Sequence, residues 1–463
     1  MLRFFPILVI FFWYACSAKK QDVSPPNIVV IIADDLGWGD VGYHGSEIRT
    51  PNIDKLAKEG VELNRFYTTP ICSPTRAGLL TGRYPDRYGL RNNVIRPWLD
   101  FGVDTTEVLL PEILEKVGYK NRALVGKWHL GHSRGAFHPM NRGFSYFYGH
   151  LNGAIGYFDF RREGQKDWHD GFKVSSDTGY TTDLITKKAV NLIEQYVGQG
   201  SPFFLQVAYN APHSPLQAQR KYLDQYGFDA GKPRHNSWRG SGNTARQTYS
   251  AMVTNLDDGV GEILDALQKW KIGENTFVFF MSDNGAEPRH GGSSGMLRGE
   301  KHTEWEGGVR TPAVVRWPVG FQGGWQLNEV TSYIDLFPTI VHLVDSDFSS
   351  SRKIDGVNII PLLQDRELRL DRDLFIGNGV VVNRNWKLVE TNEINPRMKN
   401  EEDLLFHISE DPYELNNLKS NETEVYSKLR REVWKYKQIK SSLPAPSDRR
   451  PDDFVAPKNW TIQ

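Results

Sequence analysis

Cysteine is scarce in this chain, because Cys16 and Cys72 are the two among 463 residues. Cys16 lies at the end of an N-terminal apolar stretch, so Cys72 has no partner for a disulfide within the mature fold. The chain also lacks a net charge, since 56 lysines and arginines balance 56 aspartates and glutamates. A nucleic-acid-binding protein typically has a strong excess of positive charge, so we expect local pockets to do the binding and no nucleic acid as partner.

The apolar run from Phe4 to Tyr14 is too short to span a bilayer. Arg3 precedes it and Ala15-Cys16-Ser17 follows, which is the pattern of a secretory signal over residues 1–15. Cleavage after Ala15 would leave Cys16 first, as in bacterial lipoproteins, although Trp13-Tyr14 departs from the usual leucine-rich motif. We therefore expect an exported protein that is periplasmic, secreted, or an outer-membrane lipoprotein with a lipid anchor on Cys16. The lack of disulfides favours a bacterial envelope over an animal secretory route.

Four strand patterns are spaced along the chain. Continuous apolar runs at residues 27–33, 122–125, 203–208 and 276–281 are typical of strands covered on both faces. Helix patterns at 50–60, 109–117, 183–196 and 252–270 lie between them, whereas 137–180 has little periodicity and is expected to form loops. We therefore predict an α/β fold in which helices sandwich a large mixed, mainly parallel sheet. In such sheets the site lies beyond the carboxyl ends of the strands.

The last third of the chain has a different pattern. Residues 334–343 predict a helix that closes the large unit, and a polar linker begins at Ser346. Short strand patterns at 374–379, 380–383, 386–390 and 404–408 precede a helix pattern at 424–437 and a Pro- and charge-rich tail from Ser441. We expect a catalytic domain over residues 25–345 and a C-terminal subdomain over 346–463, with a small antiparallel sheet, one helix and a tail that wraps the surface.

The residues that follow two of the strands suit a hard cation. Asp34 and Asp35 come directly after the first strand, and Asp283 and Asn284 come after the fourth. Adjacent buried carboxylates are costly unless a cation binds them. Carboxylate and amide oxygens are ligands that Ca²⁺ and Mg²⁺ prefer. The alternative for the first pair is a helix N-cap with a spare acid.

Basic side chains follow the other two strands. Lys127 and His129 come after the second strand, and on extended backbone two positions apart they would share one face. His213 comes after the third strand. Solvated surface positions for the first two and a structural role for His213 are the alternatives. Their places at strand ends favour side chains that point into a common cleft.

Cys72 begins the segment Cys72-Ser73-Pro74-Thr75-Arg76. Proline favours the first turn of a helix, so we predict a loop that turns into a helix with Cys72 at its N-terminal end. The thiol would then lie near unpaired backbone donors and the positive end of the helix. Arg76 returns to the same face one turn later. The alternative is a buried structural cysteine.

The segment Cys-x-Pro-x-Arg followed by Leu80-Thr81-Gly82-Arg83 resembles the signature of the type I, formylglycine-dependent sulfatases. Residues 126–131, Gly-Lys-Trp-His-Leu-Gly, are similar to a second motif of that family. The likeness runs from about Asn27 to Leu418, and segments at 48–51, 81–84 and 89–90 look most like the arylsulfatase B branch. It implies an alkaline phosphatase-like superfold with a C-terminal subdomain. It also implies that a formylglycine-generating or anaerobic sulfatase-maturating enzyme oxidises Cys72 to formylglycine.

The resemblance also implies a role for each polar residue. One Ca²⁺, rather than Mg²⁺, would be held by Asp34, Asp35, Cys72 as formylglycine, Asp283 and Asn284. Arg76 and Lys127 would hold the hydrated aldehyde that attacks sulfur, and Lys301 and His213 would contact sulfate. His213 would protonate the leaving sugar oxygen, and His129 would remove the proton from the remaining hydroxyl so that the aldehyde re-forms.

We therefore expect a sulfuric ester hydrolase that acts on a sulfated carbohydrate, such as carrageenan or ulvan fragments or a 4-sulfated galactose or N-acetylgalactosamine. Animal members of the family carry structural disulfides that this chain cannot form, which favours a bacterial polysaccharide sulfatase. The alternatives are a phosphate mono- or diester hydrolase of the same superfold and a non-catalytic glycan-binding lipoprotein. The loop residues that could reach the cleft are Arg96, Trp98, Trp168, His169, Arg289, His290, His302 and Trp305.

Overall fold

The structure of the protein is a computed structural model that describes residues 25–391, 395, 397–398 and 400–462. The predicted signal peptide over residues 1–15 and Cys16 lie outside the described residues. Within the described part of the chain, no helix has the length and apolar character needed to cross a membrane.

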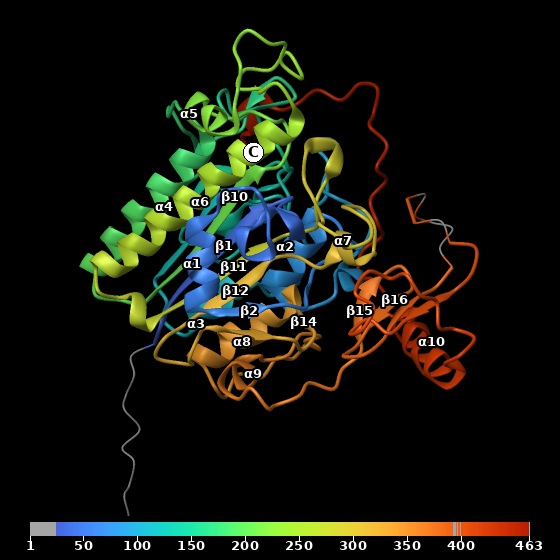
Figure 1. Cartoon of the computed structure of the whole chain (residues 1–463). Helices are drawn as coiled ribbons and strands as arrows, with labels where there is room; N and C mark the ends of the chain where they lie inside the picture. Colours follow the sequence, from blue (N-terminus) through green and yellow to red (C-terminus); the bar gives the residue numbers. More distant parts are fainter. Residues whose placement is uncertain (1–24, 392–394, 396, 399, 463) are drawn as a thin grey trace, which may run out of the picture.

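A ten-stranded sheet lies at the centre of the molecule, in the order β13-β2-β12-β11-β1-β10-β4-β5-β8-β9 (Figure 1). Strands β11, β1, β10, β4 and β5 are parallel neighbours, and β12 runs antiparallel to β11. The predicted mixed, mainly parallel sheet is therefore confirmed. Its strands are β1 (Asn27–Asp34), β2 (Val61–Leu63), β4 (Asn121–Lys127), β5 (Tyr146–His150), β8 (His169–Asp170), β9 (Lys173–Val174), β10 (Phe203–Pro212), β11 (Thr276–Ser282), β12 (Ala313–Arg316) and β13 (Trp325–Leu327).

Strand β1 shows why the sheet needs helices on both faces. Its side chains alternate between two cores, with Ile28, Val30 and Ile32 in one and Val29 and Ile31 in the other. A strand that is apolar at every position can be buried only when both faces are covered. The helices that follow supply those covers.

Helices α1 (Pro51–Glu59), α4 (Thr181–Gly198) and α6 (Ala245–Lys269) share the core with Val29 and Ile31. Helices α2 (Cys72–Thr81), α3 (Leu110–Lys116) and α8 (Leu336–Val344) share the core with Ile28 and Val30. Figure 1 shows α4 and α6 on one side of the sheet and α8, with α9 (Ile360–Gln364), on the other. The short helices α5 (Arg220–Leu223) and α7 (Glu306–Val309) lie in connecting segments.

The small C-terminal unit is an antiparallel sheet with one helix, as predicted. Its strands are β15 (Leu374–Gly377), β16 (Val380–Val382), β17 (Lys387–Val389) and β18 (Leu404–Phe406). Helix α10 (Thr423–Lys437) packs Leu429 and Val433 against Val381 and Leu388 of this sheet. Two further strand pairs are β3 (Phe66–Tyr67) with β14 (Thr331–Ser332) and β6 (Arg161–Arg162) with β7 (Gln165–Lys166).

After α10 the chain returns to the large sheet unit, where it appears in red in Figure 1. The backbone N–H of Ser442 donates to the carbonyl of Arg87 at 2.8 Å. Near the end of the chain, Trp460 is only 1% exposed and packs edge-on against the ring of His132. The predicted tail therefore follows the surface and ends in a buried aromatic anchor.

Several elements differ from the sequence-based predictions. Strands β2, β12 and β13 of the large sheet were not predicted, and two further elements show why such differences arise. Residues 146–150 form strand β5 inside the region expected to be loops, because their backbone pairs in parallel with β4. Helix α6 begins at Ala245 rather than at 252, because the hydroxyl of Thr244 accepts the backbone N–H of Gln247 and caps the helix there.

Candidate active site

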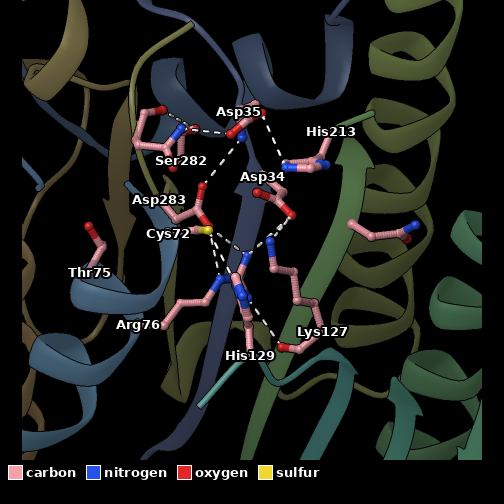
Figure 2. Close-up of polar contacts among 12 residues, drawn as sticks. Asp34, Asp35, Cys72, Thr75, Arg76, Lys127, His129, His213, Ser282 and Asp283 are labelled. Carbon is pink, nitrogen blue, oxygen red and sulfur yellow. Dashed lines mark hydrogen bonds and ion pairs between the residues drawn. The ribbon is translucent and has the colours of Figure 1, made fainter. Parts of the chain in front are cut away.

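The predicted catalytic and metal-binding residues meet at one end of the sheet (Figure 2). Asp34 and Asp35 come from the end of β1, Lys127 from β4 and His213 from the residue after β10. Asp283 and Asn284 follow β11, and Cys72 and Arg76 come from the first turns of α2. His129 and Lys301 lie in loops. Because parallel strands end at the same edge, residues more than 200 positions apart become neighbours.

Cys72 occupies the first turn of α2 and is 3% exposed. Its Sγ lies 3.3 Å from Nδ1 of His129. The neighbouring Ser73 donates its hydroxyl to the carbonyl of His129 at 3.0 Å and accepts the backbone N–H of Ile95. Burial raises the pKa of the Cys72 thiol, so the side chain stays protonated at neutral pH in this environment.

The tautomer of His129 follows from its second contact. Nε2 lies 3.1 Å from the carbonyl oxygen of Ile95, which can only accept, so Nε2 carries the proton. Nδ1 is therefore the acceptor that faces Cys72. Burial, together with the charges of Lys127 and Arg76, lowers the pKa of His129 well below its ordinary value. The ring is thus a neutral base directed at Sγ.

Arg76 and Lys127 each bind a carboxylate close to the Cys72 thiol. Nε of Arg76 donates to Oδ2 of Asp283 at 2.8 Å, and Nζ of Lys127 donates to Oδ2 of Asp34 at 2.5 Å. Arg76 also donates to the carbonyl of Lys127 at 3.2 Å. Burial and the nearby Asp283 carboxylate raise the pKa of Asp34 to about 7 in spite of these two cations.

Asp35 makes a second cluster beside the first. Nζ of Lys301 donates to Oδ1 of Asp35 at 2.5 Å, Nδ2 of Asn284 donates to the same oxygen at 2.7 Å, and Nε2 of His213 lies 3.7 Å from Oδ2. Burial opposes ionisation, but Lys301 and His213 hold the pKa of Asp35 below its ordinary value. The carboxylate in turn raises the pKa of Lys301 against the effect of burial.

His213 is the more exposed of the two histidines, with 18% of its side chain accessible. Its Nδ1 lies 2.6 Å from the carbonyl oxygen of Ser214, so Nδ1 carries a proton and Nε2 points toward Asp35. Burial lowers the pKa of His213 well below its ordinary value, and Asp35 partly offsets this. The ring can therefore donate a proton from Nε2 only in its charged form.

The oxygen atoms around Cys72 fit a hard cation. Oδ1 of Asp34 and Oδ1 of Asn284 are buried and have no hydrogen-bond partner among the described residues. Ligand atoms of Asp34, Cys72 and Asp283 all lie within 4.8 Å of one another. A buried oxygen without a partner costs about 1–3 kcal/mol, which a bound cation would offset. The donor set of carboxylates and an amide suits Ca²⁺.

The predicted geometry of Lys127 and His129 was wrong, although both residues reach the site. Strand β4 ends at Lys127, so the pair is not on one extended strand. His129 has a φ of 59°, in the left-handed region. This turn, rather than strand alternation, brings the ring over Cys72.

The cluster lies at the bottom of a cavity of about 330 Å³. Of the eight loop residues proposed from the sequence, Arg96, His290 and His302 line it. Trp168 and His169 are instead buried in the sheet unit, and Trp305 packs under the guanidinium of Arg298. Trp98 packs against the tail residue Phe454, and Arg289 is exposed outside the lining. Residues of the lining that sequence reasoning missed include Ile95, Arg162, Trp238 and Glu287.

Comparison with known proteins identifies the family. The family model described as Sulfatase matches residues 26–346 of this chain. The chain belongs to the sulfatase family. This sulfatase is 38% identical to N-acetylgalactosamine-6-sulfatase of Mus musculus over 381 residues, which cover 77% of this chain and 69% of that protein. It is a sulfuric ester hydrolase, as the sequence motifs predict.

Solved structures resemble this sulfatase over most of its length. The crystal structure of Ps i-CgsB in complex with k-i-k-neocarrahexaose is 31% identical, with a TM-score of 0.79 over 90% of this chain and 93% of that chain. The structure of PsFucS1 sulfatase from Pseudoalteromonas sp. is 26% identical, with a TM-score of 0.73 over 90% of this chain and 91% of that chain. The predicted sulfatase fold is thus confirmed.

Proposed function

We propose that this sulfatase removes sulfate from a sulfated carbohydrate and that Cys72, once oxidised to formylglycine, supplies the nucleophile. The observation that carries the proposal is the pairing of Cys72 with His129. A side chain at a helix start lies 3.3 Å from a histidine nitrogen that can only accept, at the bottom of a cavity. Covalent catalysis needs this combination of nucleophile and adjacent base.

The carbohydrate part of the proposal is supported by the relatives. One is named for N-acetylgalactosamine 6-sulfate, and one structure holds k-i-k-neocarrahexaose. We favour a bacterial polysaccharide sulfatase that acts on carrageenan-like or ulvan-like fragments, or on sulfated galactose or N-acetylgalactosamine. The arylsulfatase B-like preference for the 4-position competes with the 6-position named in the relative, and a panel of both esters decides between them.

The charges of the site suit an anionic ester. Asp34, Asp35 and Asp283 face three buried cations, Arg76, Lys127 and Lys301, so the described side chains are close to neutral. A Ca²⁺ held by the three aspartates, Asn284 and modified Cys72 would supply two further positive charges beside the sulfate. Positive charge held in a buried site stabilises the charge that develops as the ester breaks.

Proton transfer is assigned to the two histidines. His129 accepts a proton from the side chain at position 72 through Nδ1. His213 donates through Nε2 to the leaving sugar oxygen, in its charged form. An anionic sulfate bound beside Nε2 favours that form, because an opposite charge raises the pKa of a histidine. Lys301, whose amine lies at the same cavity, contacts the sulfate oxygens.

The test begins at Cys72. Cys72→Ser expressed in a host that modifies only cysteine is expected to lose turnover of an aryl sulfate, and the wild-type peptide is expected to carry an aldehyde by mass spectrometry. Retained turnover in Cys72→Ser, or an unmodified thiol in a fully active protein, would contradict the proposal. Faster turnover of an aryl phosphate than of the sulfate would favour the phosphate ester hydrolase instead.

Calcium is tested separately through stability. Ca²⁺ at a hundred times its Kd is expected to stabilise the folded protein by about 2.7 kcal/mol relative to protein in excess chelator. Asp34→Asn is expected to abolish this difference. Asp40→Asn changes a buried aspartate that is bonded to Arg246 and Tyr249 instead, so it should retain the calcium effect whatever its own stability. Equal unfolding midpoints with and without Ca²⁺ would argue against the ion.

A further inference from the structure

A second, larger cavity of about 700 Å³ lies between the edge of the large sheet and the small C-terminal sheet. We refer to it as the arginine cleft. Five arginines line it, together with Glu329, the one acid of the lining among the described residues. They are Arg65, Arg310, Arg366, Arg369 and Arg384.

The arginine cleft opens at the same edge of the sheet as the catalytic cavity. Strand β12 is antiparallel to β11, β2 is antiparallel to β12, and β13 is parallel to β2, so β2 and β13 run in the direction of β1. The residues that follow these strands, Asn64, Arg65, Asn328 and Glu329, line the cleft. Four strand steps separate β13 from β1, which places the cleft roughly 20 Å from Asp35 along the edge.

The arginine cleft carries more positive than negative charge. Nε of Arg384 and Nε of Arg369 lie 3.5 and 3.8 Å from the same oxygen of Glu329, and Nη2 of Arg369 lies 3.7 Å from the exposed Glu367, so these two guanidinium groups pair with carboxylates only at long range. Arg65 is 6% exposed and donates to the carbonyl of Asn383 at 2.9 Å. A carbonyl fixes a guanidinium in place without neutralising it, so the charge remains available to an anion.

Arg310 adds a second fixed cation at the inner end. It is 7% exposed and donates to the backbone and side-chain oxygens of Asn64 at 2.8 and 2.7 Å. The nearest carboxylate, Glu306 at 3.7 Å, is itself paired with Lys387 at 2.9 Å. The cleft therefore combines two buried, positioned arginines with three exposed ones at its mouth.

The remaining lining matches a sugar chain better than a bare anion. Among the amide side chains of the lining, Asn64 is used internally, because its Oδ1 accepts from Arg310 and its Nδ2 donates to Oδ1 of Asn328. Nδ2 of Asn328, Oε1 of Gln326 and the amide of Asn385 can donate to or accept from hydroxyl groups. Trp325 supplies an aromatic surface, with the guanidinium of Arg366 at 5.1 Å from its ring. Guanidinium groups bind tetrahedral oxyanions through paired N–H donors.

We propose that the arginine cleft is a second, non-catalytic binding site for sulfated carbohydrate, which rests on the proposed function of the catalytic cavity. Its arginines bind sulfate esters along the chain while another ester of the same molecule occupies the cavity over Cys72. Two linked contacts raise the local concentration of the polymer at the catalytic site. The cleft thus favours polymeric over monosaccharide substrates.

The test uses the full-length protein and dextran sulfate as the probe, with neutral dextran as the reference polymer. Affinity electrophoresis is expected to show retardation in gels that contain dextran sulfate and none in gels that contain dextran. Arg369→Ala/Arg384→Ala is expected to weaken that binding about tenfold or more, since each charge-assisted contact contributes about 1.5–3 kcal/mol. The matched control, Arg431→Ala/Lys440→Ala, removes two exposed charges at and beyond α10 and is expected to keep the wild-type retardation.

Turnover of an aryl sulfate separates this inference from the proposed function. All variants are expected to keep wild-type turnover, because neither pair touches the catalytic cavity. Equal retardation of the two double variants, or no retardation of the wild type, would overturn the cleft as a binding site while leaving catalysis intact. If the wild-type protein shows no sulfatase activity while Arg369→Ala/Arg384→Ala alone loses retardation, the result would support the cleft and contradict the proposed function.

Discussion

At the scale of single residues, the backbone around His129 fixes the direction of its ring. Its left-handed φ of 59° is a conformation that costs a non-glycine residue about 1–2 kcal/mol. The hydroxyl of Ser73 donates to the carbonyl of His129, and Nε2–H of His129 donates to the carbonyl of Ile95. These two contacts fix the tautomer and direct Nδ1 toward position 72.

His129→Gln is therefore expected to lower kcat for an aryl sulfate by about 10²–10⁴, the usual range for loss of a general base, with little change in KM. His132→Gln is the matched control. His132 is equally buried three positions later, but it contacts the carbonyl of Pro97 and lies outside the cavity lining. Similar loss of kcat in both variants would show that His129 acts through structure alone.

Most residues of the candidate site could be predicted because they lie at the end of a strand or in the first turns of a helix, where topology decides the position. Lys301 lies in a loop, and only the resemblance to the sulfatase family pointed to it. The sequence did not predict most of the other residues that line the catalytic cavity. Arg162 and Trp238 come from segments without periodicity, and their places depend on packing between distant loops. Trp168 and His169 were candidates for the cavity lining, but both are buried in the sheet unit, where β8 begins at His169. A two-residue strand leaves no periodic pattern in the sequence.

At the scale of elements, the same reasoning explains which parts of the fold were predictable. Strands β1, β10 and β11 are long apolar runs, so their type follows from the sequence. Strand β5, Tyr-Phe-Tyr-Gly-His, is short and exists because β4 offers it an edge. The start of α6 depends on a single capping threonine in a polar region, which periodicity does not detect.

A buried cluster of charged side chains links α7 of the large sheet unit to β17 of the C-terminal unit. Lys387 of β17 lies 2.9 Å from Glu306 of α7 and 2.8 Å from Glu414, and all three side chains are almost fully buried. Burial, opposed by Lys387, raises the pKa of Glu414 from 4.5 to about 7. Two carboxylates thus share one lysine, and one of them retains a proton at mildly acidic pH.

The sign of the pH dependence follows from that shift. The folded state binds the proton of Glu414 more tightly, so this stabilisation is complete below about pH 4.5 and is lost as the pH rises to about 7. The free energy of unfolding of the wild-type protein is expected to fall by up to about 3 kcal/mol between these two pH values. Glu414→Gln is expected not to show this fall. Glu410→Gln, an exposed acid nearby, should leave it in place. Urea titrations at pH 5 and 7.5 measure this change in unfolding free energy. Identical pH dependence in both variants would contradict its assignment to Glu414.

At the scale of the whole molecule, the C-terminal tail braces the rim of the catalytic cavity. Nε of Arg96 donates to Asp448 at 2.8 Å, and the indole N–H of Trp460 donates to the carbonyl of Arg162 at 3.0 Å. Arg96 and Arg162 both line the cavity. The last residues of the chain therefore hold two cations at the entrance to a site built mostly from its first 300 residues.

Trp460→Ala is expected to lower the unfolding free energy by about 3–5 kcal/mol, the usual loss for a buried aromatic. It is also expected to raise KM for a carbohydrate sulfate as Arg162 loses its support. Val455→Ala is the control in the same tail, because Val455 is 84% exposed and such substitutions change stability by about 0.5 kcal/mol or less. Denaturation midpoints and steady-state kinetics measure both effects. Wild-type KM in Trp460→Ala would show that the tail does not support the rim.

If Cys72 is oxidised as proposed, its burial limits when that oxidation can take place. A thiol that is 3% exposed beneath His129 is out of reach of another protein once the molecule has folded. An enzyme that oxidises it therefore has to reach the segment before the chain folds around residue 72. Chains that fold before this oxidation would then stay inactive, so the active fraction of a preparation would depend on the relative rates of oxidation and folding.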